Sequence, residues 1–251
     1  MATGVEPINP EFSLLTESTT PLAGARRPRR RTAVAMLIGA VAATLLLAAP
    51  PAAAATSGKA THYEATGGST TNGNCSFPAL PADKLYVAVS PTEYAKGAAC
   101  GTYLDVTGPR GTVRVVVMDK CPECATGHID LSKTAFAKIG ALSDGIIPVT
   151  YSTVKNPTVP ALNFRFKNGS SRWWFALQVL NHGNRLQSVS VQVNGKWVAA
   201  TLADYNYWIY QPGAGPGPYT LLVKDIYGQQ AIVSGVTMSP TLVQTTTARL
   251  K

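Results

Sequence analysis

Hydrophobic and polar positions divide the chain into one long apolar run followed by two regions of short segments. The run, from 33 to 49, consists almost entirely of small and aliphatic residues. After it, apolar stretches of strand length alternate with clusters of Gly, Pro, Asn and Asp. This spacing is typical of short β-strands joined by turns, and it excludes long amphipathic helices.

The apolar run and its surroundings predict a secretion signal. Five arginines lie within 26–31, two prolines follow the run, and Ala53-Ala54-Ala55 fits the small-residue cleavage rule. We therefore expect residues 1–55 to be a signal peptide with a long n-region, and the mature protein to start near Thr56. A retained anchor is the alternative, because 17 residues is at the short limit for a membrane span. Cleavage predicts a secreted, extracellular or wall-associated protein without stable membrane association.

The first segmented region, residues 57–155, predicts a small β-barrel. Its segments are rich in β-branched and aromatic residues. The expected strands are 59–63, 86–90, 103–107, 112–118 and 148–152. One short helix is expected over 133–139, with Ser132 as its N-cap and Gly140 at its end.

The second segmented region, residues 158–251, predicts a β-sandwich. Two prolines in 154–160 interrupt strand pairing and favour an extended connector between the regions. Asn-Gly and Tyr-Gly turn signals recur at sandwich-like intervals. The expected strands are 162–167, 173–181, 186–193, 196–199, 208–210, 219–225 and 231–236.

Composition and charge limit the classes of molecule that the protein is expected to bind. Hydrophobic residues make up 45% of the chain and charged residues only 14%, and the net charge is +9. Five Arg and three Glu lie in residues 1–55, so the remaining chain stays basic. Basic charge on an exported protein has three interpretations: attraction to anionic wall polymers, attraction to acidic polysaccharide such as pectin, or solubility alone. Nucleic acid is not expected as a partner, because the basic residues are scattered and no recognition module is present.

The cysteines agree with export. Their even number predicts two disulfides in an oxidising compartment. Three pairings are possible, and we favour Cys75 with Cys100 and Cys121 with Cys124. The alternatives for Cys121 and Cys124 are a zinc knuckle and a redox pair. Zinc would need a second ligand pair at similar spacing, so no metal and no cofactor are expected.

Four segments together resemble microbial expansins. They are the runs 58–63 (GKATHY), 117–122 (VMDKCP), 127–136 (GHIDLSKTAF) and 169–174 (GSSRWW). The resemblance covers essentially the whole chain after residue 57. It implies a mainly β fold, with a six-stranded double-psi β-barrel followed by an immunoglobulin-like carbohydrate-binding β-sandwich. It also implies a protein that binds cellulose and loosens cell walls without hydrolysing them.

The resemblance also implies site residues. Thr61, Asp119 and Asp130 match the polar residues of the family's barrel groove, and Asp130 matches the acid on which loosening depends. Tyr63 and Cys121 stand where bacterial relatives often have Thr and Tyr, so the groove is closer to the disulfide-bearing plant and fungal patterns. The resemblance places Trp173, Trp174 and Tyr205 in an aromatic platform, and we add Lys167 to the expected substrate-binding residues.

The chemistry of the groove favours a protein that is not an enzyme. Glycoside hydrolysis ordinarily needs two carboxyl groups, and no second carboxylate here matches a hydrolytic base. Asp119 ends a predicted strand, and Asp130 is expected in a loop before the helix, where it could instead be a helix cap. His62 and His128 lack the partners of a nucleophilic site and are interpreted as surface or packing residues. The alternative is a glycan-cleaving enzyme, an endoglucanase or a lytic transglycosylase on the same barrel.

The aromatic residues suit a sugar polymer. The C–H faces of pyranose rings stack on Trp and Tyr rings while the hydroxyls stay hydrated. Strand alternation over 173–181 would bury Trp173 and expose Trp174, so a joint platform requires a bulge after Arg172 or Trp173. Trp197 and Trp208 are assigned to the core or its flank. Cellulose or another wall polysaccharide, including peptidoglycan, is the expected partner of a monomer.

Overall fold

The computed structural model describes residues 55–65 and 73–251. The expected signal peptide lies outside the described residues, apart from Ala55. Within the described ranges, no helix combines the length and the hydrophobicity needed to cross a membrane.

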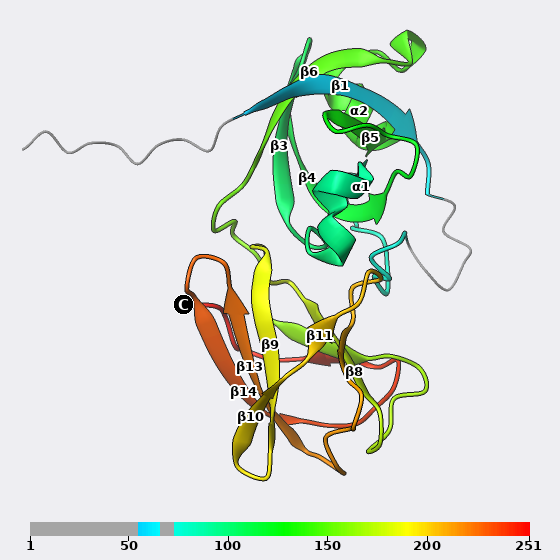
Figure 1. Cartoon of the computed structure of the whole chain (residues 1–251). Coiled ribbons are helices and arrows are strands. Elements are labelled where there is room, and N and C mark those ends of the chain that lie inside the picture. Colours follow the sequence, from blue (N-terminus) through cyan, green and yellow to red (C-terminus); the bar gives the residue numbers. More distant parts are fainter. Residues whose placement is uncertain (1–54, 66–72) are drawn as a thin grey trace, which may run out of the picture. The chain divides into compact units, whose positions relative to one another are not determined.

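The first region folds into a closed six-stranded barrel with the strand order β1-β5-β2-β4-β3-β6 (Figure 1). Strands β1 and β5 pair in parallel, as do β2 and β4, and the remaining neighbours are antiparallel. The strands are β1 (Thr56–Tyr63), β2 (Tyr86–Val89), β3 (Tyr103–Gly108), β4 (Gly111–Lys120), β5 (His128–Ser132) and β6 (Ile147–Thr153). The helical elements are α1 (Pro91–Tyr94), α2 (Lys133–Ile139) and the 3-10 turns Ala95–Gly97 and Leu142–Asp144. The five strands expected from the sequence are all present.

Helix α2 is confirmed as predicted. The Ser132 hydroxyl accepts from the Ala135 N–H at 3.1 Å, and the helix ends at Gly140. Ala135, Phe136 and Ile139 are buried in the barrel core. The cap is therefore Ser132, and Asp130 is free for another role.

The expected loop at Asp130 is wrong, because residues 128–132 form strand β5. This strand pairs with β1 on one side and β2 on the other. Both partners lie far away in sequence, so the pairing comes from the tertiary fold rather than from local preference.

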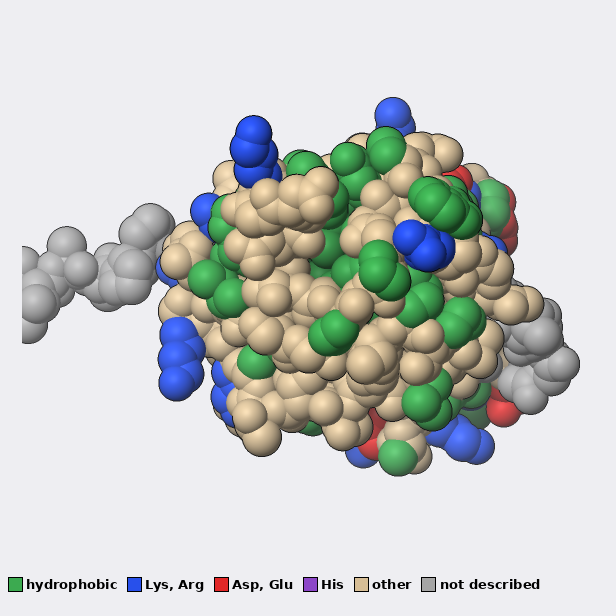
Figure 2. All heavy atoms as spheres, turned by 90° about the horizontal axis from the view of Figure 1, so that it is seen from below, with side chains coloured by type: hydrophobic (Ala, Val, Ile, Leu, Met, Phe, Trp, Pro, Cys, Tyr) green, Lys and Arg blue, Asp and Glu red, His purple; other side chains and the backbone are tan. Residues whose placement is uncertain are grey.

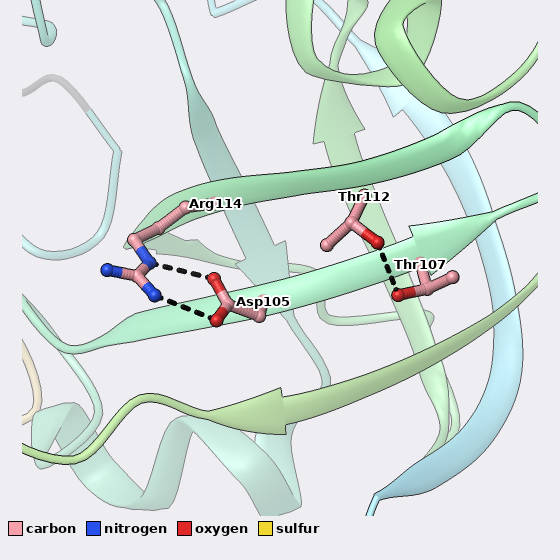
Figure 3. A network of polar contacts seen from close by, with 4 residues as sticks. All are labelled: Asp105, Thr107, Thr112 and Arg114. Atoms are coloured by element: carbon pink, nitrogen blue, oxygen red, sulfur yellow. Dashed lines mark hydrogen bonds and ion pairs between the residues drawn. The ribbon is translucent and has the colours of Figure 1, made fainter.

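On the β3–β4 hairpin, exposed side chains of the two strands pair with each other. Arg114 donates Nε to Asp105 Oδ1 at 2.7 Å and Nη2 to Asp105 Oδ2 at 2.8 Å. Two residues farther along each strand, the hydroxyls of Thr107 and Thr112 are joined by a 2.8 Å hydrogen bond (Figure 3). These cross-strand pairs are solvent-exposed, so they contribute little to stability.

The second region contains two sheets that share one hydrophobic core. The four-stranded sheet has the order β10-β9-β13-β14, and the five-stranded sheet has the order β11-β12-β8-β7-β15. The bounds are β7 (Asn163–Phe166), β8 (Phe175–Leu180), β9 (Leu186–Val193), β10 (Lys196–Ala199), β11 (Thr201–Leu202), β12 (Trp208–Tyr210), β13 (Tyr219–Asp225), β14 (Gln230–Val236) and β15 (Val243–Thr245). Strands β11 and β15 were not expected from the sequence.

On the face seen in Figure 2, hydrophobic side chains lie among polar surface, and Lys and Arg project near the rim while little acidic side chain is visible. This agrees with the basic net charge of the chain.

Both disulfides have the favoured pairing, Cys75 with Cys100 and Cys121 with Cys124. The Cys75 carbonyl accepts from Gln178 Nε2 at 2.9 Å and from Asn206 Nδ2 at 3.1 Å. Both hydrogen bonds are buried, so the segment after the disulfide is fixed to β8 and to the turn before β12. Among the described residues, no group of three or more His, Cys, Asp and Glu is placed to hold a metal ion.

Candidate functional site

Strand register aligns the predicted groove residues across the barrel. Thr61 on β1 lies opposite Asp130 on β5, Asp130 lies opposite Ala88 on β2, and Ala88 lies opposite Asp119 on β4. Directly opposed residues point to the same face of a sheet. With neighbouring strands roughly 4.8 Å apart, the backbones at the two aspartates are about 10 Å apart. The sheet therefore presents a row of polar side chains with small Ala88 at its centre.

Three side chains at one end of the row form a hydrogen-bonded group. Thr61 Oγ1 donates to Asp130 Oδ1 at 2.6 Å and lies 3.0 Å from His128 Nε2. A hydroxyl has one proton, so a Thr61 that donates to the carboxylate must accept from an Nε2–H of His128. When Asp130 is protonated, it can donate to Thr61 and the direction can reverse. His128, which was interpreted as a surface or packing residue, is thus a hydrogen-bond partner of Thr61 in the predicted groove.

The environment of Asp130 favours its protonated form. Partial burial raises the pKa of this carboxyl above its ordinary value, and the hydrogen bond from Thr61 and the charge of His128 oppose the rise. A raised pKa keeps a proton available on the carboxyl closer to neutral pH. Asp130 is therefore suited to donate a hydrogen bond or a proton to an oxygen of a bound ligand.

Asp119 is fixed in a different way. Its Oδ1 accepts from the backbone N–H of Asn74 at 2.6 Å and from its neighbour Lys120 at 2.8 Å. Gly73 makes this approach possible, because a Cβ there would lie 2.6 Å from the Met118 carbonyl oxygen and the residue has a φ of +72°. The carboxylate is thereby tied to the segment that leads to Cys75.

Tyr63 lies close enough to both aspartates to feel their charges. Burial raises the pKa of its hydroxyl, and the charges of Asp119, Tyr86 and Asp130 raise it further. Its ring makes an edge contact with Tyr86 at 5.6 Å and packs against the Cys121–Cys124 disulfide and Ala88. The hydroxyl stays neutral and can both donate and accept hydrogen bonds in the groove.

The predicted platform begins in a turn rather than in a strand. Ser171 and Trp174 exchange two backbone hydrogen bonds of 2.9 and 3.1 Å, and β8 begins only at Phe175. The prediction that the strand starts at 173 is therefore wrong. Neither strand alternation nor a bulge decides the exposure of Trp173 and Trp174, because both precede the strand. Trp173 is 71% exposed, with the Arg172 guanidinium 4.6 Å from its ring centre, whereas Trp174 is half-buried.

Tyr205 and Lys167 lie next to each other. The Lys167 ammonium is 5.8 Å from the ring centre of Tyr205, and the rings of Tyr205 and Tyr207 are 6.0 Å apart. The neighbouring Asp204 carbonyl accepts from the Tyr94 hydroxyl at 2.5 Å and from Asn74 Nδ2 at 3.0 Å. Asn74 thus bonds both Asp119 of the groove and the backbone beside Tyr205, a link that the sequence did not indicate.

The structure also places the remaining Trp residues and His62. Trp208 is only 7% exposed and belongs to the core, whereas Trp197 is 41% exposed on β10. His62 packs edge-on against Phe136 at 4.8 Å and is 3.2 Å from the Leu142 carbonyl oxygen, as a packing residue would be.

Comparison with known proteins agrees with this arrangement. A family model described as lytic transglycolase, for a double-psi β-barrel domain, matches residues 55–151. The chain is 36% identical to expansin YoaJ of Bacillus subtilis over 168 residues, which are 65% of this chain and 72% of the relative. It is 30% identical to expansin-like protein 1 of Dictyostelium discoideum over 62% of this chain and 59% of that protein.

The solved structures agree in both sequence and fold. The crystal structure of an expansin from Clavibacter michiganensis matches with a TM-score of 0.76 and 50% identity, covering 78% of this chain and 98% of the other. An aspartate-to-asparagine variant of that protein, crystallised in complex with cellohexaose, matches equally well. The chain belongs to the expansin family.

Proposed function

We propose that this protein is exported, binds cellulose or a related wall polysaccharide, and loosens contacts between polymers without cleaving them. The observation that carries the proposal is the presence in one chain of a polar row in the barrel and, in the second region, the exposed ring of Trp173 with the half-buried rings of Trp174 and Tyr205. The Clavibacter relative in complex with cellohexaose supports a linear β-glucan as the ligand. The apolar run and the Ala53-Ala54-Ala55 sequence support export.

The two sets of residues have separate roles in this proposal. Trp173, Trp174, Tyr205 and Lys167 hold the polymer by stacking and by a cationic contact. Thr61, Tyr63, Asp119 and Asp130 compete for hydroxyls that otherwise bond to a neighbouring glycan chain. Displacement of hydrogen bonds needs donors and acceptors in a fixed row, but it needs no activated water.

Non-hydrolytic action is favoured by the state of the two acids. Hydrolysis ordinarily uses one carboxyl as acid and another as base or nucleophile. In the barrel, Asp130 has the raised pKa expected of an acid, but Asp119 is bound through Oδ1 by two backbone N–H groups. This arrangement suits a hydrogen-bond acceptor of fixed position.

Lytic transglycosylation is the second candidate, on one specific observation. The family model that matches residues 55–151 carries that description, and Asp130 is a single acid with a raised pKa. Such an enzyme would release soluble muropeptides from purified peptidoglycan.

One experiment separates the two functions. The purified protein is incubated with cellulose paper and with peptidoglycan, and extension under constant load is measured together with new reducing ends and soluble products. We expect extension of the paper without products from either polymer. Asp105→Asn is the matched control, because this exposed carboxylate pairs with Arg114 on the β3–β4 hairpin (Figure 3). Products that accumulate with the wild type and the control, but not with Asp130→Asn, would contradict non-hydrolytic action.

A further inference from the structure

The hydroxyl of Tyr63 differs from the other polar groups of the predicted groove. Thr61 and Asp130 bond to each other, and Asp119 accepts from two backbone N–H groups. Tyr63 is two residues after Thr61 on β1, so both side chains point to the same face of the sheet. Within the described ranges, no hydrogen bond engages the Tyr63 hydroxyl. This hydroxyl thus lies near the polar row with its donor and its acceptor unused.

The ring of Tyr63, by contrast, is held by two contacts. It makes an edge contact with the ring of Tyr86 at 5.6 Å, and it packs against the buried cluster of Ala88, Cys121 and Cys124. Sulfur makes favourable contacts with aromatic rings. A tyrosine side chain rotates about two bonds, so the place of its hydroxyl depends on what the ring packs against.

The Cys121–Cys124 disulfide is itself fixed where it meets this ring. It lies directly after β4, and each of its cysteines is only 5% exposed. The Cys121 N–H donates to the Val89 carbonyl at 2.9 Å, and the Cys124 N–H donates to the Cys121 carbonyl at 3.2 Å. Val89 follows Ala88 on β2, which belongs to the polar row. The disulfide is therefore tied to the strand beside that row.

Loop length separates this disulfide from the other one. Cys75 and Cys100 have a sequence separation of 25 and belong to the barrel core. Cys121 and Cys124 have a separation of 3 and cluster outside that core with Ala88 and Tyr63. A crosslink over so short a loop constrains the unfolded chain much less. What it holds in the folded state is thus the stronger reason for it.

We propose that the Cys121–Cys124 disulfide is a positioning element for Tyr63. It keeps the ring packed so that the unbonded hydroxyl stays at the polar row, where it bonds to a hydroxyl of a bound glycan chain. Only Tyr63 touches the glycan, and the two sulfurs act through its ring. The inference rests on the proposed function for the identity of the ligand, but the placement of the ring is tested without it.

The first test follows the ring itself. The tyrosines are labelled with fluorotyrosine, and the fluorine NMR resonance of Tyr63 is assigned by its absence in Tyr63→Phe. In Cys121→Ser with Cys124→Ser, this resonance should move toward that of free fluorotyrosine, because the ring loses the surface that fixes it. Val233→Ala is the matched control, since it destabilises the core of the second region and should leave the resonance in place. Unchanged resonances of the other tyrosines show that each variant has folded.

The second test measures the extension of cellulose paper at matched amounts of bound protein. Tyr63→Phe should slow extension about 2- to 10-fold, the effect of losing one hydrogen bond between neutral groups, with unchanged cellulose binding. The double serine variant should show the same loss. Adding Tyr63→Phe to it should cause no further loss, because both changes remove one interaction. Val233→Ala should extend the paper as the wild type does.

Two results would overturn the proposal. The first is an unmoved Tyr63 resonance in the double serine variant. The second is an additive loss of extension when the changes are combined. The loop would then act by another route, such as Glu123: burial raises the pKa of Asp130, and the charge of Glu123 adds to the rise. A wild type that extends no paper would contradict the proposed function, and the resonance alone then decides whether the disulfide positions the ring.

Discussion

The predicted groove and the predicted platform hold their candidate side chains by opposite means. In the barrel, Thr61 and Asp130 are aligned by strand register and joined at 2.6 Å. In the second region, Trp173 lies in a turn, is 71% exposed and has the Arg172 guanidinium against its ring. Buried polar groups need fixed partners, whereas an exposed ring needs only a place at the surface. In the proposed function, the barrel residues therefore make directional hydrogen bonds, and the exposed ring stacks on a repeating polymer.

The two disulfides should differ most in their contribution to stability. Cys75 and Cys100 close a loop with a sequence separation of 25, whereas Cys121 and Cys124 are separated by 3. Loop-closure entropy then predicts a loss of about 3–4 kcal/mol in the free energy of unfolding for Cys75→Ala with Cys100→Ala, and of about 2 kcal/mol for the shorter loop. Denaturant titration of both double variants measures the difference. Equal losses would show that loop length is not the main cause.

Trp173→Ala should weaken cellulose binding with little effect on folding. Loss of a large exposed ring removes about 1–3 kcal/mol of stacking and burial, or about a 5- to 150-fold change in affinity. The melting temperature should barely change. Binding isotherms on cellulose, together with thermal unfolding, measure both effects.

Trp208 and Trp197 provide the matched controls. Trp208→Ala removes a core ring, so it should cost about 3–5 kcal/mol of stability. Trp197→Ala removes an exposed ring of β10 outside the predicted platform, so it should leave both quantities unchanged. A Trp173→Ala protein that melts many degrees lower and binds normally would assign Trp173 a packing role.

Two aspartates of the barrel should respond to pH with opposite sign. Burial raises the pKa of Asp130, so its contribution to stability is present below the unfolded-state pKa of about 3.9 and is lost as pH rises through the folded value. Arg114 lowers the pKa of Asp105, so its contribution is present above about 3.9 and is lost as pH falls.

The asparagine variants make this difference measurable. At pH 7, Asp130→Asn should raise the free energy of unfolding, and Asp105→Asn should lower it slightly, because that ion pair is exposed. Both differences should shrink at pH 3. Urea titrations at the two pH values measure them, and changes of the same sign at pH 7 would refute the assignment.

The sequence predicted the parts of the fold that have local causes. Helix α2 has its cap, its apolar face and its terminating glycine within nine residues, 132–140. Strand β5 was missed because its partners β1 and β2 lie elsewhere in the chain. The turn at Ser171–Trp174 was missed because aromatic residues before an apolar run favour strand on propensity alone.

The candidate site residues also differ in whether a local sequence motif or a distant contact reveals them. The motif residues Asp119 and Asp130 were identified, but the bridging role of Asn74 depends on a contact that no local pattern reveals. Lys167 was predicted as a substrate-binding residue, and its ammonium lies 5.8 Å from the ring centre of Tyr205. Its closeness to Tyr205 comes from the tertiary fold, because the two residues are far apart in sequence.

The central claim is that binding and loosening depend on different residues of one chain. The most direct test measures the extension of cellulose paper under load at matched amounts of bound protein, for the wild type and Asp130→Asn. The account predicts unchanged binding and a loss of extension in the variant, with Asp105→Asn equal to the wild type. Extension by Asp130→Asn equal to that of the wild type, at equal bound protein, would contradict the account.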